Sequence, residues 1–204
     1  MTNHRVLSPA DYRRMPWKNG GGHTSEIAVH PEGAGTAAFV WRVSVADVAQ
    51  GGPFSRYPGV DRTLVLLAGN GVRLEGAGDP LELRTPYEPV RFTGEAELDC
   101  VLTDGPVRDF NLMVRRDAAT GEIIVVREGG QAIAPAQAYV CFAAAGPSEC
   151  LVAGYPPLVV APEHSLVMLV DPQTVPPALH VYPTSAQSVA LVAVIGAPNA
   201  RLGQ

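Results

Sequence analysis

The sequence predicts an all-β fold made of two stacked β-barrel halves in one chain, with one or two short helices. Glycine and proline, 21 and 19 of the 204 residues, are spread along the whole chain as turn signals. Between them stand short segments that alternate in polarity or run apolar for four to eight residues. Many short strands separated by turns are typical of a sandwich or a barrel.

Each strand is predicted from one such segment. The segments lie near residues 23–29, 39–46, 61–68, 71–75, 81–84, 96–103, 107–115, 122–127, 138–143, 149–153, 157–161, 165–170, 179–182 and 188–195. Helical signals are scarce. Ser8 as N-cap and Pro9 at the first helical position predict a short helix. The segment "VADVAQGG" at 45–52 predicts one further helical turn.

A weak internal repeat predicts the two halves. "LLAGNGVRL" at 66–74 resembles "AAAGPSECL" at 143–151, and "PLELRTP" at 80–86 resembles "PLVVAP" at 157–162. Both matches have the same offset, because Gly146 follows Gly69, and Pro157 follows Pro80, by 77 positions. We therefore expect an N-terminal half at 1–116 that carries a ligand pocket, and a C-terminal half at 117–204 that is mainly structural.

Composition argues against several classes of protein. A net charge of -5 without a basic run predicts no nucleic-acid partner. No apolar run approaches the roughly 18 residues that span a bilayer, and the N-terminal residues contain no signal-peptide core, so no membrane partner and a cytoplasmic location are expected.

Metal and nucleophile chemistry are also poorly supported. The five histidines never occur as HxH or HxxH, so neither a metal nor a cofactor is expected. Cys100, Cys141 and Cys150 are odd in number and widely spaced, which predicts inert core thiols. No local motif for a catalytic Ser or Cys triad is present.

Three predicted strands carry one polar face each. Because successive strand residues point to opposite faces, the polar residues of each strand share a side. These faces carry Thr24 and Glu26 on the first strand, Arg42 and Ser44 on the second, and Asp109, Asn111 and Arg115, together with the apolar Met113, on the third. If these faces line a barrel interior, they form a pocket with Arg42 as its cationic anchor. The alternative is that they face water, as is usual in an antiparallel sheet.

Two further segments bear on this pocket. Asp61 and Arg62 open an apolar strand, either as a strand-end ion pair or as a charged rim of the pocket. The segment "MPWKNGGGHTSEI" holds Lys18, the only lysine of the chain, directly before the Gly20–Gly22 run. The glycines predict a tight chain reversal or a close approach of the backbone to a ligand.

The motifs "PWKNGGGHTSEIA", "FVWRVSVADV", "GPFSRYPGVDRTLVLLAGNGVRL" and "FTGEAELDCVLTDGPVRDFNLMVRR", in this order, resemble the HutD/Ves family. The resemblance covers residues 7–116 closely and the remainder loosely. It implies a bicupin fold and an association with bacterial histidine utilisation, through regulation or protection of the pathway and binding of N-formylglutamate. The matching motif residues are Trp17, Lys18, Asn19, Gly20 to Gly22, Thr24, Glu26, Trp41, Arg42, Ser44, Phe54, Ser55, Pro58, Gly59, Asp61, Arg62, Asp109, Asn111 and Met113.

The leading hypothesis is a protein that senses or sequesters a small acidic catabolite. Lys18 and Arg42 would bind its carboxylates, because a compact ammonium and a guanidinium suit that role. One alternative is a metal-independent enzyme acting on a formyl or amide group, with Glu26 or Asp109 as general base. Another is an interaction module, such as a homodimer formed through the C-terminal half. The predicted ligand-binding residues are Trp17, Lys18, Asn19, Gly21, Thr24, Glu26, Arg42, Ser44, Asp61, Arg62, Asp109, Asn111 and Met113.

Overall fold

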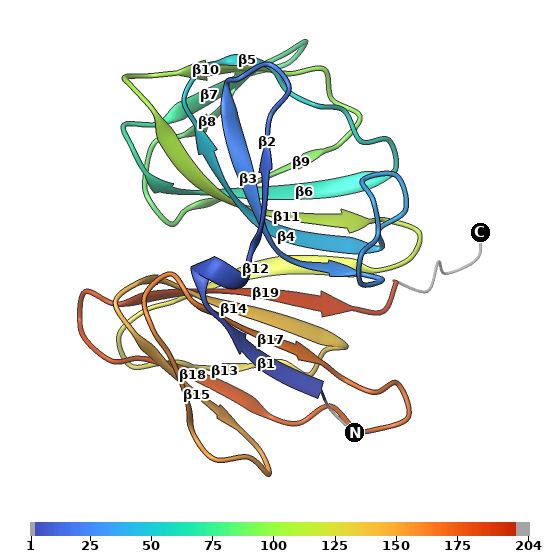
Figure 1. Cartoon of the computed structure of the whole chain (residues 1–204), viewed down its shortest axis with the longest axis vertical. Coiled ribbons are helices and arrows are strands. Elements are labelled where there is room, and N and C mark those ends of the chain that lie inside the picture. The colour runs from blue at the N-terminus through green and yellow to red at the C-terminus, as the bar shows by residue number, and fades with distance from the viewer. Residues whose placement is uncertain (1–2, 199–204) are drawn as a thin grey trace. The chain divides into compact units, whose positions relative to one another are not determined.

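The computed structural model describes residues 3–198, which fall into two compact units (Figure 1). One unit consists of residues 13–120, and the other combines residues 3–12 with residues 121–197. Each unit is built from two sheets, and the described strand pairs are antiparallel. The predicted all-β fold with two similar halves is confirmed.

The unit of residues 13–120 contains a six-stranded and a four-stranded sheet. The larger has the order β2-β3-β4-β11-β6-β9, with β2 (Arg13–Pro16), β3 (Gly22–His30), β4 (Trp41–Val48), β11 (Val107–Arg115), β6 (Val60–Ala68) and β9 (Pro89–Thr93). The smaller has the order β5-β10-β7-β8, with β5 (Gly52–Pro53), β10 (Asp99–Leu102), β7 (Val72–Glu75) and β8 (Leu81–Leu83).

The other unit contains a five-stranded and a four-stranded sheet. The larger has the order β1-β17-β14-β19-β12, with β1 (Asn3–Leu7), β17 (Ser165–Leu169), β14 (Ala138–Ala145), β19 (Val189–Gly196) and β12 (Thr120–Val126). The smaller has the order β13-β18-β15-β16, with β13 (Gln131–Ile133), β18 (Leu179–Pro183), β15 (Ser148–Val152) and β16 (Leu158–Val160).

The repeat seen in the sequence corresponds to equivalent elements. Gly69 stands in the turn between β6 and β7, and Gly146 stands in the turn between β14 and β15. Both glycines have a positive φ, +95° and +60°, which favours glycine at this point of both turns. Pro80 and Pro157 directly precede β8 and β16, respectively. The offset of 77 therefore relates β6–β7–β8 to β14–β15–β16.

The helix predictions hold only in part. Ser8 caps a single 3₁₀ turn, η1 (Pro9–Asp11), through a capping box in which its backbone N–H and its hydroxyl donate to the Asp11 carboxylate at 2.8 and 2.6 Å. The second predicted turn, within 45–52, is wrong: residues 45–48 continue β4, because Val45 and Val48 pair in register with β11.

The sequence analysis missed five of the strands. Strands β1, β2, β5, β9 and β13 were not predicted; they are short or rich in polar residues and proline. Strand β1 pairs with β17 along its whole length, so the first residues belong to the sheet of the C-terminal half. The observed division thus differs from the proposed boundary at 116/117.

Each unit contains a cluster of buried apolar residues. Tyr139, Leu166, Met168 and Val192 are among the buried residues of one, and Leu64, Leu66, Leu74 and Leu83 are among those of the other. Within residues 3–198, no helix has the length and apolar character needed to cross a membrane.

Candidate functional site

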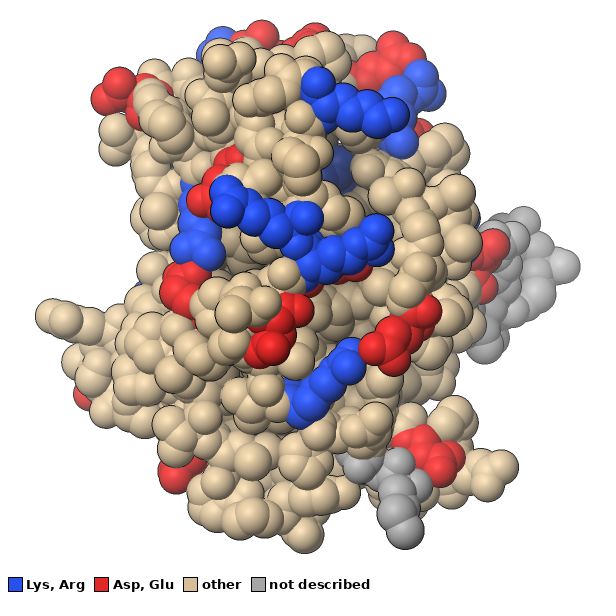
Figure 2. All heavy atoms as spheres, viewed as in Figure 1, with Lys and Arg blue, Asp and Glu red and all other residues tan. Residues whose placement is uncertain are grey.

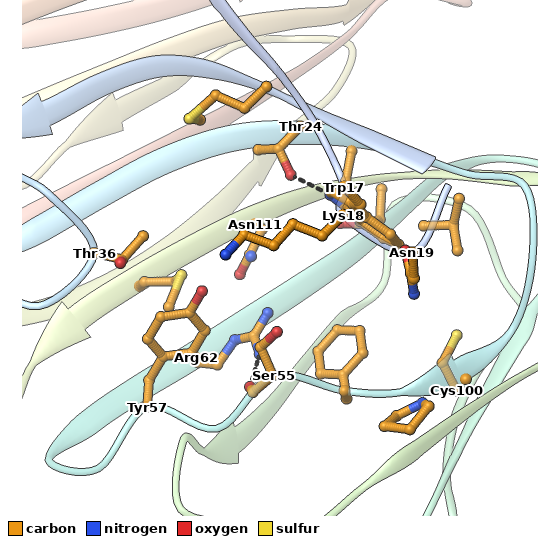
Figure 3. A pocket seen from close by; sticks show the side chains of 18 of the residues that line it. Trp17, Lys18, Asn19, Thr24, Thr36, Ser55, Tyr57, Arg62, Cys100 and Asn111 are labelled. Carbon is orange, nitrogen blue, oxygen red and sulfur yellow. Dashed lines mark hydrogen bonds between the residues drawn. The ribbon is translucent and has the colours of Figure 1, made fainter. Parts of the chain in front are cut away.

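A cavity of about 580 Å³ lies within the unit of residues 13–120 (Figure 3). It is lined by the inner faces of strands from the six-stranded sheet, by β5 and β10, and by the loop that joins β2 to β3. Thr24, Arg42, Arg62, Asp109 and Asn111 contribute polar groups. The polar strand faces therefore line an interior, and the alternative that they face water is wrong for these residues.

Strand register arranges these side chains in rows across the sheet. Met113 of β11 stands between Arg42 of β4 and Arg62 of β6, so one end of the cavity wall is cationic. Asn111 lies two residues further along β11, and Asp109 two residues beyond that. With about 3.4 Å per strand residue, successive rows are about 7 Å apart. The wall thus changes from guanidinium groups to an amide and then to a carboxyl group.

The glycine run builds the loop that presents Lys18 to the cavity. The Trp17 N–H donates to the Gly22 carbonyl at 2.9 Å, and the Gly20 N–H donates to the Trp17 carbonyl at 3.1 Å, which closes a tight hairpin. Gly20 has a φ of +72°. A Cβ on Gly22 would lie 2.3 Å from the Asp47 carbonyl oxygen and 3.2 Å from the Trp17 ring. The predicted chain reversal is confirmed, and glycine is required at both positions.

The hairpin fixes Trp17 and leaves Lys18 free. The Trp17 indole N–H donates to the Thr24 hydroxyl at 2.9 Å, which holds the ring against the cavity wall. Lys18 is exposed at the backbone turn, and Figure 3 shows its side chain extended over the cavity. Among residues 3–198, no carboxylate pairs with Lys18. A cationic group is therefore available to a molecule in the cavity.

Arg42 is compensated by a buried carboxylate. Its Nε donates to the Glu26 Oε2 at 2.6 Å, and both side chains are 8% exposed. Arg13, largely exposed, also lies 3.9 Å from Glu26. Glu26 itself does not line the cavity. The sequence analysis made Arg42 the cationic anchor, but in the structure its charge is already balanced.

Arg62 is buried without such a carboxylate. It is 5% exposed, and its guanidinium carbon lies 4.4, 5.1 and 5.5 Å from the ring centroids of Phe54, Phe92 and Tyr57. One Nη donates to the Ser55 carbonyl at 3.3 Å, and Nε has no hydrogen-bond partner among the described residues. Burial lowers the pKa of Arg62 to about 10, so the group remains charged at neutral pH.

Other arginines of this unit differ from Arg62, because they form ion pairs at the surface. Arg116 contacts Asp61 and Glu95, and Arg56 contacts Glu97. Hydrogen bonds from Arg116 and the Gly59 N–H hold the pKa of Glu95 at about 2. Figure 2 shows basic and acidic side chains interspersed on one face of the molecule. Exposed pairs of this kind contribute little to stability, whereas Arg62 is buried beside a cavity and forms no salt bridge with another described residue.

Asp109 is a buried carboxyl group on the same wall. It is 8% exposed, and burial raises its pKa to about 7, with the nearby Arg62 acting in the opposite direction and Asp47 adding to the rise. It therefore exchanges a proton near neutral pH, which suits a group that donates or accepts one.

The structure brings together nine of the thirteen predicted site residues. Those that line the cavity are Trp17, Lys18, Asn19, Thr24, Arg42, Arg62, Asp109, Asn111 and Met113. Gly21, Glu26, Ser44 and Asp61 do not line it. Asp61 and Arg62 do not pair with each other: adjacent strand residues face opposite sides, and Asp61 accepts a 2.8 Å hydrogen bond from Arg116.

Sequence reasoning missed some of the lining. Thr36, Tyr57 and Cys100 line the cavity, and Phe92 packs on Arg62. The segment "SRYPG" was interpreted only as a turn, so its Tyr57 was not considered as a lining residue. The sequence around Thr36 contains no motif that would indicate a binding site. The three cysteines are buried and free, as predicted for core thiols. Burial raises the pKa of Cys100 to about 11, which makes it a poor nucleophile.

No group of three or more His, Cys, Asp or Glu side chains within residues 3–198 is arranged to hold a metal ion. The polar groups that line the cavity include three cations, Lys18, Arg42 and Arg62, of which Arg42 pairs with Glu26. They also include the Asn111 Oδ1, which has no hydrogen-bond partner among the described residues, and the Asp109 carboxyl group with its raised pKa.

Relatives of known sequence match a little over half of the chain. A 21.2 kDa protein encoded in the hutC 3′ region of Pseudomonas putida is 42% identical over 113 residues, covering 55% of this chain and 59% of that protein. Protein Ves of Citrobacter koseri is 38% identical over 119 residues, covering 56% of this chain and 61% of Ves. The chain thus matches about three fifths of the length of these relatives.

Solved structures show the same fold over nearly the whole chain. A conserved protein of unknown function from Pseudomonas aeruginosa has a TM-score of 0.86 at 30% identity, covering 96% of this chain and all of that one. HutD from Pseudomonas fluorescens has a TM-score of 0.78 at 30% identity, covering 96% and 99%. Oxalate decarboxylase from Bacillus subtilis, 7% identical with a TM-score of 0.61 and covering 96% and 77%, shares the bicupin fold alone. The HutD family model matches residues 9–178, and this chain belongs to the HutD family.

Proposed function

We propose that this protein binds a small acid such as N-formylglutamate in the cavity, and that it senses or sequesters this compound in histidine utilisation. The observation that carries the proposal is the buried guanidinium of Arg62 at the cavity wall, which forms no salt bridge with another described residue and whose Nε has no hydrogen-bond partner among them. A buried charge without a partner is costly, and a carboxylate supplied by a ligand would balance it. Lys18 offers a second cation at the same cavity. Membership of the HutD family supports the link to histidine utilisation.

The equivalent position in the other unit supports this assignment. The repeat offset of 77 relates Arg62 to residue 139, a tyrosine that is 1% exposed. Its hydroxyl accepts a hydrogen bond from the Ala136 N–H at 2.6 Å and donates to the Ala134 carbonyl at 3.2 Å. One half therefore fills this position with a buried tyrosine whose hydroxyl has its own hydrogen-bond partners, while the other half places there a buried arginine that forms no salt bridge with another described residue.

The test is a thermal-shift and calorimetric titration of chelator-treated protein with N-formyl-L-glutamate, glutamate, urocanate and formate. A ligand at 100 times its dissociation constant stabilises the fold by about 2.7 kcal/mol, which raises the midpoint by roughly 5–10 °C for a chain of this size. The Arg62→Met variant keeps a side chain of similar length between the aromatic rings but removes the charge. We expect its affinity for the acid to fall at least about 100-fold.

The matched control is Arg56→Met, which removes an exposed arginine and should leave the affinity within about twofold. Binding of the acid by Arg62→Met with unchanged affinity would contradict the proposal. So would the absence of any saturable shift with these four compounds.

Lys18 has a test of its own. Lys18→Arg keeps the charge but replaces a compact ammonium by a planar fork, so we expect affinity for the acid to fall about 3- to 10-fold while the unfolding midpoint stays the same. Calorimetry measures the first quantity and a thermal melt the second. Unchanged affinity would remove Lys18 from the site.

Asp109 favours a second candidate, a metal-independent hydrolase of a formyl amide. A carboxyl group with a pKa of about 7 inside the cavity can take a proton from water as the water adds to the formyl carbon. The C–N bond then breaks, and the proton passes to the departing amine. Asp109 suits this role better than Glu26, which lies outside the cavity lining and is held by Arg42. Release of formate from N-formyl-L-glutamate, lost in Asp109→Asn, would establish it; no release would rule it out.

A further inference from the structure

Asp109 is the only carboxyl group among the described residues that line the cavity, and none of those residues is a histidine. Its side chain is 8% exposed, and its carboxyl group forms no salt bridge with another described residue. A carboxylate in such a place is poorly solvated, whereas the protonated carboxyl group loses much less on burial. The ionisation state of Asp109 therefore depends on the other charges around the cavity.

Those charges come from the strands that pair with β11 and from the elements that line the cavity with it. Burial raises the pKa of Asp109 most, to about 7, while Arg62 of β6 lowers it and Asp47 of β4 raises it. Arg62 is thus the cavity group that favours the ionised form of Asp109. The other charged or titratable groups are Arg42 with its partner Glu26, Lys18, Tyr57, Cys100, and the neighbours of Asp47, namely His23 and Arg108.

An acid bound at Arg62 would remove the influence that favours the ionised form. Its carboxylate balances the guanidinium, so the attraction between Arg62 and an ionised Asp109 is weakened. The acid also brings a negative charge of its own into the cavity, which repels a second carboxylate. In addition, it displaces water from the cavity wall, which makes a charged Asp109 more costly. All three effects favour the protonated form of Asp109.

We propose that binding of an acid in the cavity is coupled to the uptake of one proton by Asp109, so that the protein binds the acid more tightly as the pH falls and releases it as the pH rises. This inference rests on the proposed function, since it requires that an acid binds at Arg62. It adds a regulatory property to the site: the pH changes the affinity through one identified residue.

The sign and the size of the effect follow from linkage between proton and ligand. At a pH where Asp109 is ionised in the ligand-free protein, a proton must be taken from solution for each acid bound, so the affinity falls by up to about tenfold per pH unit. At a pH where Asp109 is already protonated, the affinity is constant. With a pKa of about 7, the dissociation constant should rise about 10- to 30-fold between pH 6 and pH 8.5.

The experiment is a calorimetric titration of the full chain with N-formyl-L-glutamate, whose carboxyl groups stay ionised over this pH range. Dissociation constants are measured in half-unit steps from pH 6 to pH 8.5. At pH 8.5 the titration is repeated in Hepes and in Tris, which release different heats when they give up a proton. The difference in measured heat between the two buffers gives the number of protons bound, and we expect about 0.5 to 1 proton taken up per acid.

Variants assign the proton to Asp109. Asp109→Asn has no proton to gain, so its dissociation constant should stay the same from pH 6 to pH 8.5 and should be about 10- to 30-fold lower than that of the parent at pH 8.5. Asp109→Ser provides the same test of the pH dependence if asparagine impairs folding. Asp79→Asn is the matched control, because Asp79 is exposed and lies outside the cavity lining, and it should keep the proton uptake of the parent.

The outcomes separate this inference from the function on which it rests. Binding of the acid with a constant affinity and no proton uptake would overturn the inference and leave acid binding intact. Proton release on binding would also overturn it, since Asp109 would then be ionised in the complex. So would a pH dependence that persists in both Asp109 variants. Failure of the acid to bind at any pH would overturn the proposed function as well.

Discussion

Replacing Glu26 by glutamine is expected to lower the free energy of unfolding by about 3–5 kcal/mol. Glu26 accepts a 2.6 Å hydrogen bond from Arg42, and both side chains are 8% exposed. Removing one partner of a buried ion pair leaves the other charge without compensation in a medium that solvates it poorly. Glutamine keeps the shape of the side chain and a carbonyl acceptor, so the loss of unfolding free energy reports the contribution of the negative charge of Glu26. Urea unfolding of the two proteins at pH 7 gives the difference.

A double-mutant cycle separates this ion pair from general damage to the sheet. Combining Glu26→Gln with Arg42→Met removes both charges, and we expect it to recover most of the stability lost by Glu26→Gln alone. The exposed Glu88 supplies the control, since Glu88→Gln should change stability by less than about 0.5 kcal/mol. A loss from Glu26→Gln that matches the control would show that Arg42 does not depend on Glu26.

Asp109→Asn is expected to stabilise the ligand-free protein above neutral pH, by on the order of 2–4 kcal/mol at pH 8. Burial raises the pKa of Asp109 from 3.8 to about 7, so the folded protein binds this proton more tightly than the unfolded chain does. The stability that this group contributes is therefore full below about pH 4 and is lost as the pH rises toward 7, by up to about 1.4 kcal/mol per pH unit. Asparagine has no proton to lose, so the variant lacks this decline.

The measurement is a series of urea unfolding curves from pH 4 to pH 8 for both proteins. The exposed Asp79 provides the matched control, because Asp79→Asn should leave the pH profile of the parent protein in place. Parallel profiles for the parent and Asp109→Asn would show that Asp109 titrates as an ordinary exposed carboxyl group, and would weaken its candidacy as an acid or base.

The polar cavity wall was predictable because it depends on the period of two within strands. Thr24 and Glu26, Arg42 and Ser44, and Asp109 and Asn111 each share a face in the structure, as the alternation predicts. The glycine hairpin that carries Lys18 was predictable for a similar reason, since three consecutive glycines before a strand indicate a tight reversal. Both features are local.

The balance of charges was not predictable, because it depends on which strands are neighbours. Sequence alone could not show that β4 lies between β3 and β11. This order places Glu26 beside Arg42, whereas Arg62, on the far side of β11, forms no salt bridge with another described residue. Nor could the sequence show that Phe92, from an unpredicted strand, packs on Arg62. Strand β1 was missed because its five residues, NHRVL, are too polar and too short to stand out, and its partner is distant in sequence.

The pairing of β1 with β17 has a consequence for how the protein is made. The ribosome synthesises residues 3–7 before the unit of residues 13–120, yet their partner strand at 165–169 emerges only after that unit. The unit of residues 13–120 can fold from one continuous stretch in the meantime. Strand β1 thus stays without its partner strand while the unit of residues 13–120 is synthesised and folds. A fragment that starts after residue 12 would leave the edge of β17 open, inviting association between chains.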